Sequence, residues 1–151
     1  MKNKTQNSET IWAYIAGLVD GEGYFKIRHI KNSKLKRGYA REFLLTITNT
    51  SKPLLLEVQK QIGLGKIYTH NPKNGNANTG YTLRFFAGNC RIILPNIIPY
   101  LLLKKKLAEV LLESLNIIRS THPSKIKEKR LMQLEKKYIY EFSVYKKMLE
   151  E

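Results

Sequence analysis

Aspartate occurs once in this chain of 151 residues, at Asp20, and acidic residues of both kinds number 12 against 27 lysines and arginines. The formal net charge of +15 makes a polyanion the expected partner. Residues 1–108 hold 18 basic but only five acidic residues, whereas residues 109–151 hold nine and seven. Carboxylate chemistry therefore has few places to occur, and the basic surface belongs to the first two-thirds of the chain.

Cysteine is equally scarce, because Cys90 stands alone and an internal disulfide is excluded. We expect this residue to fill space in the core. No apolar run approaches the roughly 20 residues of a membrane span, and residues 1–9 are too polar for a signal peptide. The sequence therefore predicts a soluble intracellular protein, in a prokaryotic cytoplasm or an organelle, with no membrane and no small-molecule cofactor as partner. The length and the 42% hydrophobic content fit a single domain over residues 1–151.

The most informative stretch is residues 15–23, with the sequence IAGLVDGEG, where an apolar helix ends in two acids. The pattern predicts a helix over residues 8–23, with Ser8 as its N-cap and Glu9 in its first turn. A glycine inside a helix costs about 1 kcal/mol relative to alanine, so Gly17 calls for the close approach of another backbone.

At about 100° per residue, one narrow face of this helix holds Ala13, Ala16, Gly17 and Asp20, and the opposite face holds Ile11, Ile15 and Leu18. This pattern predicts a helix with no solvent face, packed on its own core on one side and on a second helix on the other. The chain has only one such stretch. We therefore expect a homodimer in which the small-residue face forms the interface across a two-fold axis.

Alternating polarity after this helix predicts two β-hairpins, over residues 24–49 and 65–87, with a helix between them and further helices over residues 89–150. In the second strand we expect Phe43, Leu45 and Ile47 to face the core and Leu44 to face outward. The fold class is therefore α+β, with a four-stranded antiparallel sheet whose inner face is covered by helices.

The first hairpin carries charge of one sign, since no acid lies between Glu22 and Glu42 while seven basic residues do. A solvated run of surface charge normally mixes both signs. The unbroken positive hairpin therefore favours a nucleic-acid surface over an ordinary solvated face.

Residues 15–23 are similar to the motif of the LAGLIDADG homing endonucleases, with Ile15 for the first leucine, Val19 for the isoleucine and Glu22 where the second aspartate usually stands. An ordinary core helix ending in a glycine-rich turn is the alternative. The resemblance extends over residues 8 to about 118 and implies the αββαββα fold of that family. It leaves the role of residues 119–151 open. Family members with a single motif are homodimers whose sheets cover a long, nearly palindromic DNA site.

The resemblance also implies a metal site. The family's essential ligand is the second acid, here Glu22, often joined by the preceding carbonyl, that of Gly21. Mg²⁺ is the expected ion, or Mn²⁺, and Ca²⁺ would bind without supporting turnover. Hard oxygen ligands suit such ions in phosphodiester hydrolysis. We expect Asp20 to have a structural role at the helix end rather than to bind metal.

Two further residues match the family's catalytic pattern. Asn49 falls where the family has a polar side chain that positions metal-bound water, although an asparagine that caps the next turn is an equally good interpretation. Lys104 matches a lysine that contacts solvent near the scissile phosphate. Lys106 is a second candidate for that role, and Lys52 lies near a position that is basic in some members.

Recognition is then expected from the outward residues of the two hairpins. Four of them suit base edges in the major groove, namely Lys26, Arg28, Thr46 and Arg84. Four more suit phosphates, namely Lys34, Lys36, Arg37 and Lys66. Tyr68, His70 and Thr82 complete the expected DNA-binding set.

The resemblance therefore implies an intron-encoded, homodimeric, Mg²⁺-dependent endonuclease that makes a staggered break in double-stranded DNA. The alternative is a non-catalytic nucleic-acid binder on the same fold, either an RNA splicing maturase or a DNA-binding regulator. A basic dimerising domain without sequence preference is a third possibility. The presence of Glu22, Asn49 and Lys104 together favours the enzyme.

Overall fold

The computed structural model describes residues 4–73 and 78–151. Its elements, in chain order, are α1 (Lys4–Glu22), β1 (Gly23–Lys31), β2 (Tyr39–Asn49), α2 (Lys52–Ile62), β3 (Lys66–His70), β4 (Gly80–Phe86), α3 (Ala87–Ile97), the short 3-10 helix η1 (Ile98–Tyr100), α4 (Lys105–Arg119) and α5 (Ser124–Glu150). The predicted α+β class and the order of helices and hairpins are confirmed. No helix among the described residues is long and apolar enough to cross a membrane.

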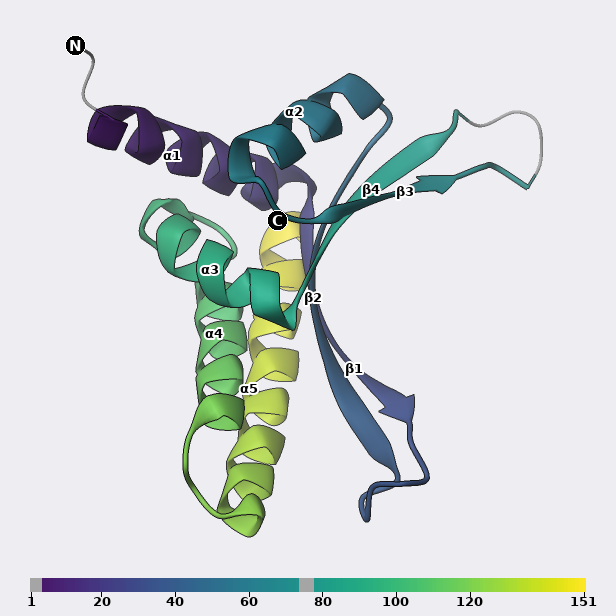
Figure 1. Cartoon of the computed structure of the whole chain (residues 1–151), viewed down its shortest axis with the longest axis vertical. Helices are drawn as coiled ribbons and strands as arrows, with labels where there is room; N and C mark the ends of the chain where they lie inside the picture. The colour runs from purple at the N-terminus through teal and green to yellow at the C-terminus, as the bar shows by residue number, and fades with distance from the viewer. Residues whose placement is uncertain (1–3, 74–77) are drawn as a thin grey trace.

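The four strands form one antiparallel sheet in the order β1-β2-β4-β3. The helices lie on one side of it, and the two hairpins diverge so that the strand pair β1–β2 and the strand pair β3–β4 extend toward opposite ends of the sheet (Figure 1). Phe43, Leu45 and Ile47 face the buried side as predicted. Leu44 does belong to the outer face, but it is 3% exposed because Lys26 and Phe86 flank it in register on the neighbouring strands.

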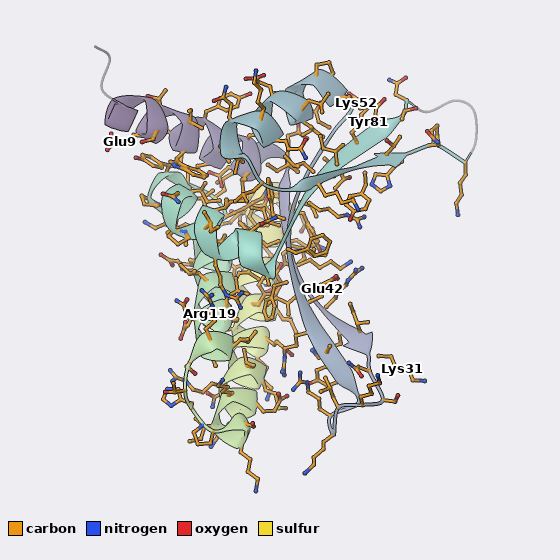
Figure 2. The ribbon with its side chains drawn as sticks, viewed as in Figure 1. Glu9, Lys31, Glu42, Lys52, Tyr81 and Arg119 are labelled. Atoms are coloured by element: carbon orange, nitrogen blue, oxygen red, sulfur yellow. The ribbon has the colours of Figure 1, made fainter. Side chains whose placement is uncertain are left out.

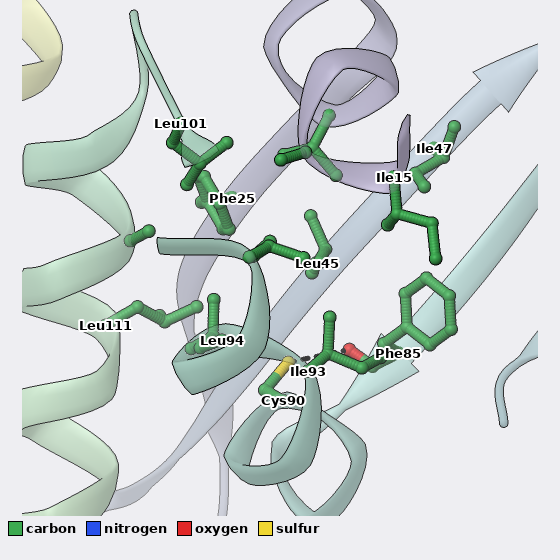
Figure 3. Close-up of a cluster of buried hydrophobic side chains, with 14 of the residues drawn as sticks. Ile15, Phe25, Leu45, Ile47, Phe85, Cys90, Ile93, Leu94, Leu101 and Leu111 are labelled. Atoms are coloured by element: carbon green, nitrogen blue, oxygen red, sulfur yellow. Dashed lines mark hydrogen bonds between the residues drawn. The ribbon is translucent and has the colours of Figure 1, made fainter. Parts of the chain in front are cut away.

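The core fills the space between the sheet and the helices, and side chains from α1, the sheet, α3 and α4 meet there (Figure 3). Cys90 lies in it as predicted, and its thiol donates a hydrogen bond to the carbonyl oxygen of Phe85 at 3.2 Å. Burial raises the pKa of this thiol to about 12. Cys90 is therefore a neutral core residue.

Helix α1 begins at Lys4, four residues before the predicted start, so Ser8 lies inside the helix and is not its N-cap. The buried stripe consists of Ile15, Ala16 and Val19. Ala16 is 0% exposed, so its assignment to a dimer interface was wrong. It lies one turn from Val19 and therefore shares the face that packs on the core.

One face of the helix is exposed in the single chain, and its cover by a second copy stays a prediction. Thr10, Ala13, Tyr14, Gly17 and Gly21 are all exposed along it. A Cβ added at Gly17 or Gly21 would meet no atom within 4 Å. The chain's own packing therefore does not require either glycine, although each weakens the helix.

Gly23 is different, because strand β1 leaves the helix there in close contact with the preceding turn. A Cβ at this position would lie 2.5 Å from the carbonyl oxygen of Val19 and 2.8 Å from its Cα. Both atoms belong to the backbone, which cannot move aside as a side chain can. The close approach explains the glycine.

We expect Gly23→Ala to lower the free energy of unfolding by about 1–3 kcal/mol, the usual range for overpacking. Urea unfolding followed by circular dichroism measures the loss. Gly80→Ala is the control, because Gly80 also begins a strand but a Cβ there meets nothing within 4 Å. Equal losses in the two variants would contradict the assigned clash.

Helix α5 is one continuous helix of 27 residues that packs beside α4 (Figure 1). Its inner positions Leu131 and Leu134 are buried with Val110 and Ile117 of α4. The same helix also reaches strand β1, where the hydroxyl of Tyr138 donates a hydrogen bond to the carbonyl oxygen of Phe25. Since β1 is an edge strand, α5 covers part of the sheet's edge.

Candidate active site and nucleic-acid interface

Asp20 joins the end of α1 to the start of α4. Its carboxylate accepts hydrogen bonds from the backbone N–H groups of Leu102 at 2.7 Å, Leu103 at 3.2 Å and Lys104 at 3.0 Å. These donors precede α4 and would otherwise need water as a partner. Asp20 therefore has a structural role at the helix end, and its carboxylate is engaged within the chain.

Lys104 also joins these two elements, since its side chain extends from the start of α4 to the end of α1. Its Nζ donates to the carbonyl oxygens of Val19 at 3.0 Å, Asp20 at 2.8 Å and Gly23 at 2.7 Å. The residue is only 6% exposed. We expected a lysine that contacts solvent near the scissile phosphate, and the structure shows instead a buried ammonium that caps the C-terminal end of α1. The unpaired carbonyls of a helix end attract a cation, which explains the burial.

Glu22 is the last residue of α1 and is exposed. It lies within electrostatic reach of Lys104: burial lowers the pKa of that lysine, and the carboxylates of Asp20 and Glu22 act on it in the opposite direction. Because Lys104 binds the carbonyls of Asp20 and Gly23, which lie on either side of Glu22 in the chain, the two residues lie at the same end of α1. Because Asp20 is bound to backbone N–H groups, Glu22 is the motif's carboxylate that faces solvent.

The donor set at this end of α1 suits a hard divalent cation but is incomplete in one chain. Glu22 and the carbonyl of Gly21 are the oxygen atoms that could bind such an ion, and that carbonyl is not among the three that Lys104 binds. Among the described residues, no three His, Cys, Asp or Glu side chains form a metal-binding group. A metal held here needs further oxygen ligands from water, a phosphate or a second copy of the chain.

Asn49 ends β2, two residues beyond Ile47, which pairs with Gly23. It therefore lies at the same end of the sheet as Glu22. Its side-chain oxygen accepts a hydrogen bond from the backbone N–H of Ser51 at 2.8 Å, which is the turn-capping interpretation. Of the other basic candidates, Lys52 places its ammonium 5.7 Å from the ring centroid of Tyr81, the partner of Asn49 in register, and so lies at the same end of the sheet (Figure 2). Lys106 is exposed on α4.

The outer face of the sheet carries a row of side chains that crosses all four strands. The register aligns Tyr24, Thr46, Arg84 and Lys66 in that order. The ring of Tyr68 supports two of the cations of this face, since the Arg84 guanidinium lies 4.4 Å and the Lys66 ammonium 5.5 Å from its centroid. The row is therefore a preorganised basic surface.

Thr82 does not belong to the accessible part of this face. It is 6% exposed, and its hydroxyl lies 3.0 Å from that of Thr48, its partner in register. A central strand position between two neighbours leaves Thr82 little solvent contact. Thr48 is exposed and replaces it as a candidate contact.

The first hairpin combines accessible cations with cations that already have partners. Lys26, Lys34 and Lys36 are exposed, as is His70 at the far end of the sheet. Arg28 forms an ion pair with Glu42 across the strands. Arg37 donates to the carbonyl oxygen of Tyr39 at 2.7 Å and lies 3.7 Å from the carboxylate of Glu128. Arg28 and Arg37 are thus held by partners within the chain, but both are exposed, as the lysines are.

One group was missed by the sequence analysis, namely the contacts of α5 with the inner side of this hairpin. They involve His29, Tyr39, Arg41, Glu128 and Glu135. The available signal was the seven-residue spacing of Glu128 and Glu135, which places both acids on one face of a helix.

The comparisons with known proteins agree with this fold. The family model described as LAGLIDADG endonuclease matches residues 15–113. The archaeal intron-encoded homing endonuclease I-Vdi141I, solved in complex with DNA, is 21% identical, with a TM-score of 0.72 over 91% of this chain and 86% of that one. The homing endonuclease I-CvuI, in complex with its target in the presence of 2 mM Ca, is 21% identical, with a TM-score of 0.68 over 85% of this chain and 78% of that one.

I-SmaMI, bound to an uncleaved DNA target in the presence of calcium ions, is 26% identical, with a TM-score of 0.65 over 82% of this chain but only 42% of its own length. The search of curated proteins found no match. The family model covers about two-thirds of the chain, including the whole motif, the sheet and the lysine that caps α1. On that match, this chain belongs to the LAGLIDADG endonuclease family.

Proposed function

We propose that the protein is a sequence-specific double-strand DNA endonuclease that acts as a homodimer with a divalent metal. The observation that carries the proposal is the end of α1, where Glu22 faces solvent beside Lys104 while Asp20 is engaged in the fold. A carboxylate that stabilised only the fold would have a partner of the kind that Asp20 has. Lys104 fixes the backbone on either side of Glu22 and the carboxylate is exposed, as a ligand for a substrate-bound cation requires.

The solvent face of α1 supports the homodimer. Ala13, Gly17 and Gly21 are exposed, and the two glycines leave open space that the chain itself does not use. A second helix can approach such a face closely, and an isologous contact between two α1 helices brings two Glu22 side chains toward one axis. The second copy then supplies the carboxylate that a single chain lacks.

The basic outer face of the sheet supports DNA as the substrate. Its lysines and arginines lie on antiparallel strands, whose ribbon fits the major groove of B-DNA. The related structures I-Vdi141I and I-CvuI were solved with DNA. Thr46 and Arg84 are aligned in one row and suit base edges, whereas Lys34 and Lys36 at the hairpin loop suit phosphates.

The residues of this chain have separate tasks in the proposed reaction. Glu22 and the Gly21 carbonyl would hold the cation, and a bound Mg²⁺ would supply Lewis-acid activation of water and neutralise charge on the phosphodiester. Lys104 fixes the carbonyls of Val19, Asp20 and Gly23, and so determines the direction in which the Glu22 backbone points. Asn49, at the same end of the sheet, is the candidate for orienting water.

The test is cleavage of a randomised DNA library by the wild-type protein with Mg²⁺. We expect cuts at rare, nearly palindromic sites with staggered ends, identified by sequencing the cleaved molecules. Ca²⁺ in place of Mg²⁺ should permit binding without cleavage. A protein that binds structured RNA tightly and never cuts DNA would establish the maturase alternative instead.

A further inference from the structure

The outer part of the first hairpin has less support from the sheet than the rest of it. Strand β4 pairs with β2 only from Leu44 to Asn49. The rest of the hairpin, residues 27–31 of β1 and 39–43 of β2, is therefore a two-stranded ribbon. An isolated two-stranded hairpin is marginally stable in water. Something else must therefore hold this ribbon in one position.

Helix α5 supplies that support from the inner side, through Arg41. This side chain is 3% exposed, and its two terminal nitrogens donate to the two carboxylate oxygens of Glu128, each at 2.7 Å. Its Nε donates to Glu135, one heptad further along α5. Hydrogen bonding from Arg41 lowers the pKa of Glu128, in keeping with a tightly held ion pair. One arginine of the ribbon thus binds two acids of the helix.

The neighbouring residues extend the same contact. His29 pairs with Arg41 in register, and its Nε2 lies 3.1 Å from both carboxylate oxygens of Glu135. Its ring stacks on Tyr39 with centroids 3.9 Å apart and planes at 13°. The Tyr39 hydroxyl donates to Glu128 at 3.3 Å. We refer to His29, Tyr39, Arg41, Glu128 and Glu135 as the α5–hairpin cluster.

The cluster is far from the candidate active site. Strand β1 contains nine residues between Glu22 and the loop, and at about 3.3 Å per residue it spans about 30 Å. At about 3.4 Å per base pair, that length corresponds to about eight or nine base pairs of DNA. The helix also lies outside residues 15–113, the part of the chain that matches the family model.

We propose that α5 positions the outer half of the first hairpin for sequence reading, with Glu128 and Glu135 as positioning residues that sharpen discrimination at the outer base pairs of each half-site. This inference rests on the proposed function. The hairpin presents Lys26 and Arg28 on the face opposite the cluster, and Lys34 and Lys36 at its loop. Side chains select a base only when their backbone is fixed within about 0.5 Å, which a free two-stranded ribbon does not provide.

The test compares Glu128→Gln/Glu135→Gln with Glu109→Gln/Glu113→Gln, which removes two exposed acids from α4. Both double variants remove two negative charges, so any general gain in DNA affinity from the change in net charge is the same in the two proteins. Profiling cleavage over a site library, we expect the first pair to reduce discrimination at the outer positions about 5- to 10-fold, the size of one lost base contact, and to leave the positions nearest the cut within about twofold. The control pair should leave the whole profile unchanged.

Hydrogen exchange of the free protein provides a readout that does not depend on DNA. We expect the backbone amides of the two-stranded ribbon, residues 27–31 and 39–43, to exchange about tenfold faster or more in the first pair, while those of β3 and β4 stay unchanged. Tyr39→Phe removes only a hydroxyl of the cluster and should shift both readouts in the same direction by less. It serves as the informative variant if the double variant fails to fold.

The two readouts also separate the failure of this inference from that of the proposed function. A wild-type protein that cuts no DNA removes the proposed function, whatever the exchange data show. Loosened discrimination spread evenly over the site, or an unchanged profile with unchanged exchange, overturns the positioning role of α5. Faster exchange with an unchanged cleavage profile overturns it as well, because loosening the ribbon would then have no effect on base discrimination.

Discussion

Replacing Glu22 with glutamine should reduce the rate of DNA cleavage by about 10³-fold or more, the size of loss expected when a group that stabilises developing charge is removed. Glutamine keeps the shape of the side chain and one oxygen but loses the negative charge that a divalent cation requires. Site binding should remain within about threefold, because the outer face of the sheet, and not Glu22, makes the expected base and phosphate contacts. The fold should be unaffected, since Glu22 is exposed.

Single-turnover cleavage of a radiolabelled site in Mg²⁺ measures the rate, and fluorescence anisotropy in Ca²⁺ measures binding. Glu109→Gln is the matched control, because it removes the same charge from an exposed helical position on α4. A Glu22→Gln protein that cuts at the wild-type rate, or a control that loses as much activity, would remove Glu22 from the active site. Loss of binding together with cleavage would point to a role in DNA affinity.

Gly17→Leu should convert the proposed dimer to a monomer and abolish the proposed double-strand cleavage with it. Because nothing lies within 4 Å of a Cβ at Gly17, one chain has room for the leucine, and the fold of the individual subunit should persist. In a close contact of two α1 helices, however, the substitution adds a four-carbon side chain from each subunit. Overpacking of about 1–3 kcal/mol per side chain would raise the dimer dissociation constant about 30-fold or more across the pair.

Sedimentation velocity over a dilution series measures the dissociation, and circular dichroism checks that helix content is retained. Gly88→Leu is the control, because Gly88 is also a helical glycine with nothing within 4 Å, but it lies in α3. We expect that variant to sediment like the wild type. An unchanged dimer in Gly17→Leu would mean that the two copies meet elsewhere, and would leave the second Glu22 without a place in the active site.

The sheet was predictable from the sequence because a strand has a period of two. Phe43, Leu45 and Ile47 recur at every second position beside Glu42, Thr46 and Thr48, so their burial followed from the pattern although Leu44 interrupts it. The faces of α1 were harder, because neighbouring positions on a helix differ by only 100° and small residues carry little polarity signal. Ala16 was placed with Ala13 and Gly17 for its size, whereas packing against the core places it with Val19.

The partners of single side chains could not be predicted, because they join segments distant in sequence. Lys104 caps carbonyls 81 to 85 residues earlier, and Arg41 binds acids 87 and 94 residues later. Neither pairing leaves a local pattern. The scarcity of acids did mark Asp20 and Glu22 as the candidates for carboxylate chemistry. Only the geometry shows that the Asp20 carboxylate is bound to backbone N–H groups and that Glu22 faces solvent.

The reciprocal contact between Asp20 and Lys104 has a consequence for the order of events during synthesis. The motif is made early, but the carbonyls at its end receive their ammonium group only after residue 104 has left the ribosome. Until then the three hydrogen bonds that fix the turn from α1 into β1 are missing. A nascent chain, or one released by premature termination before this point, therefore carries the acidic motif without a usable catalytic geometry. Such a fragment should not damage the DNA of the cell that makes it.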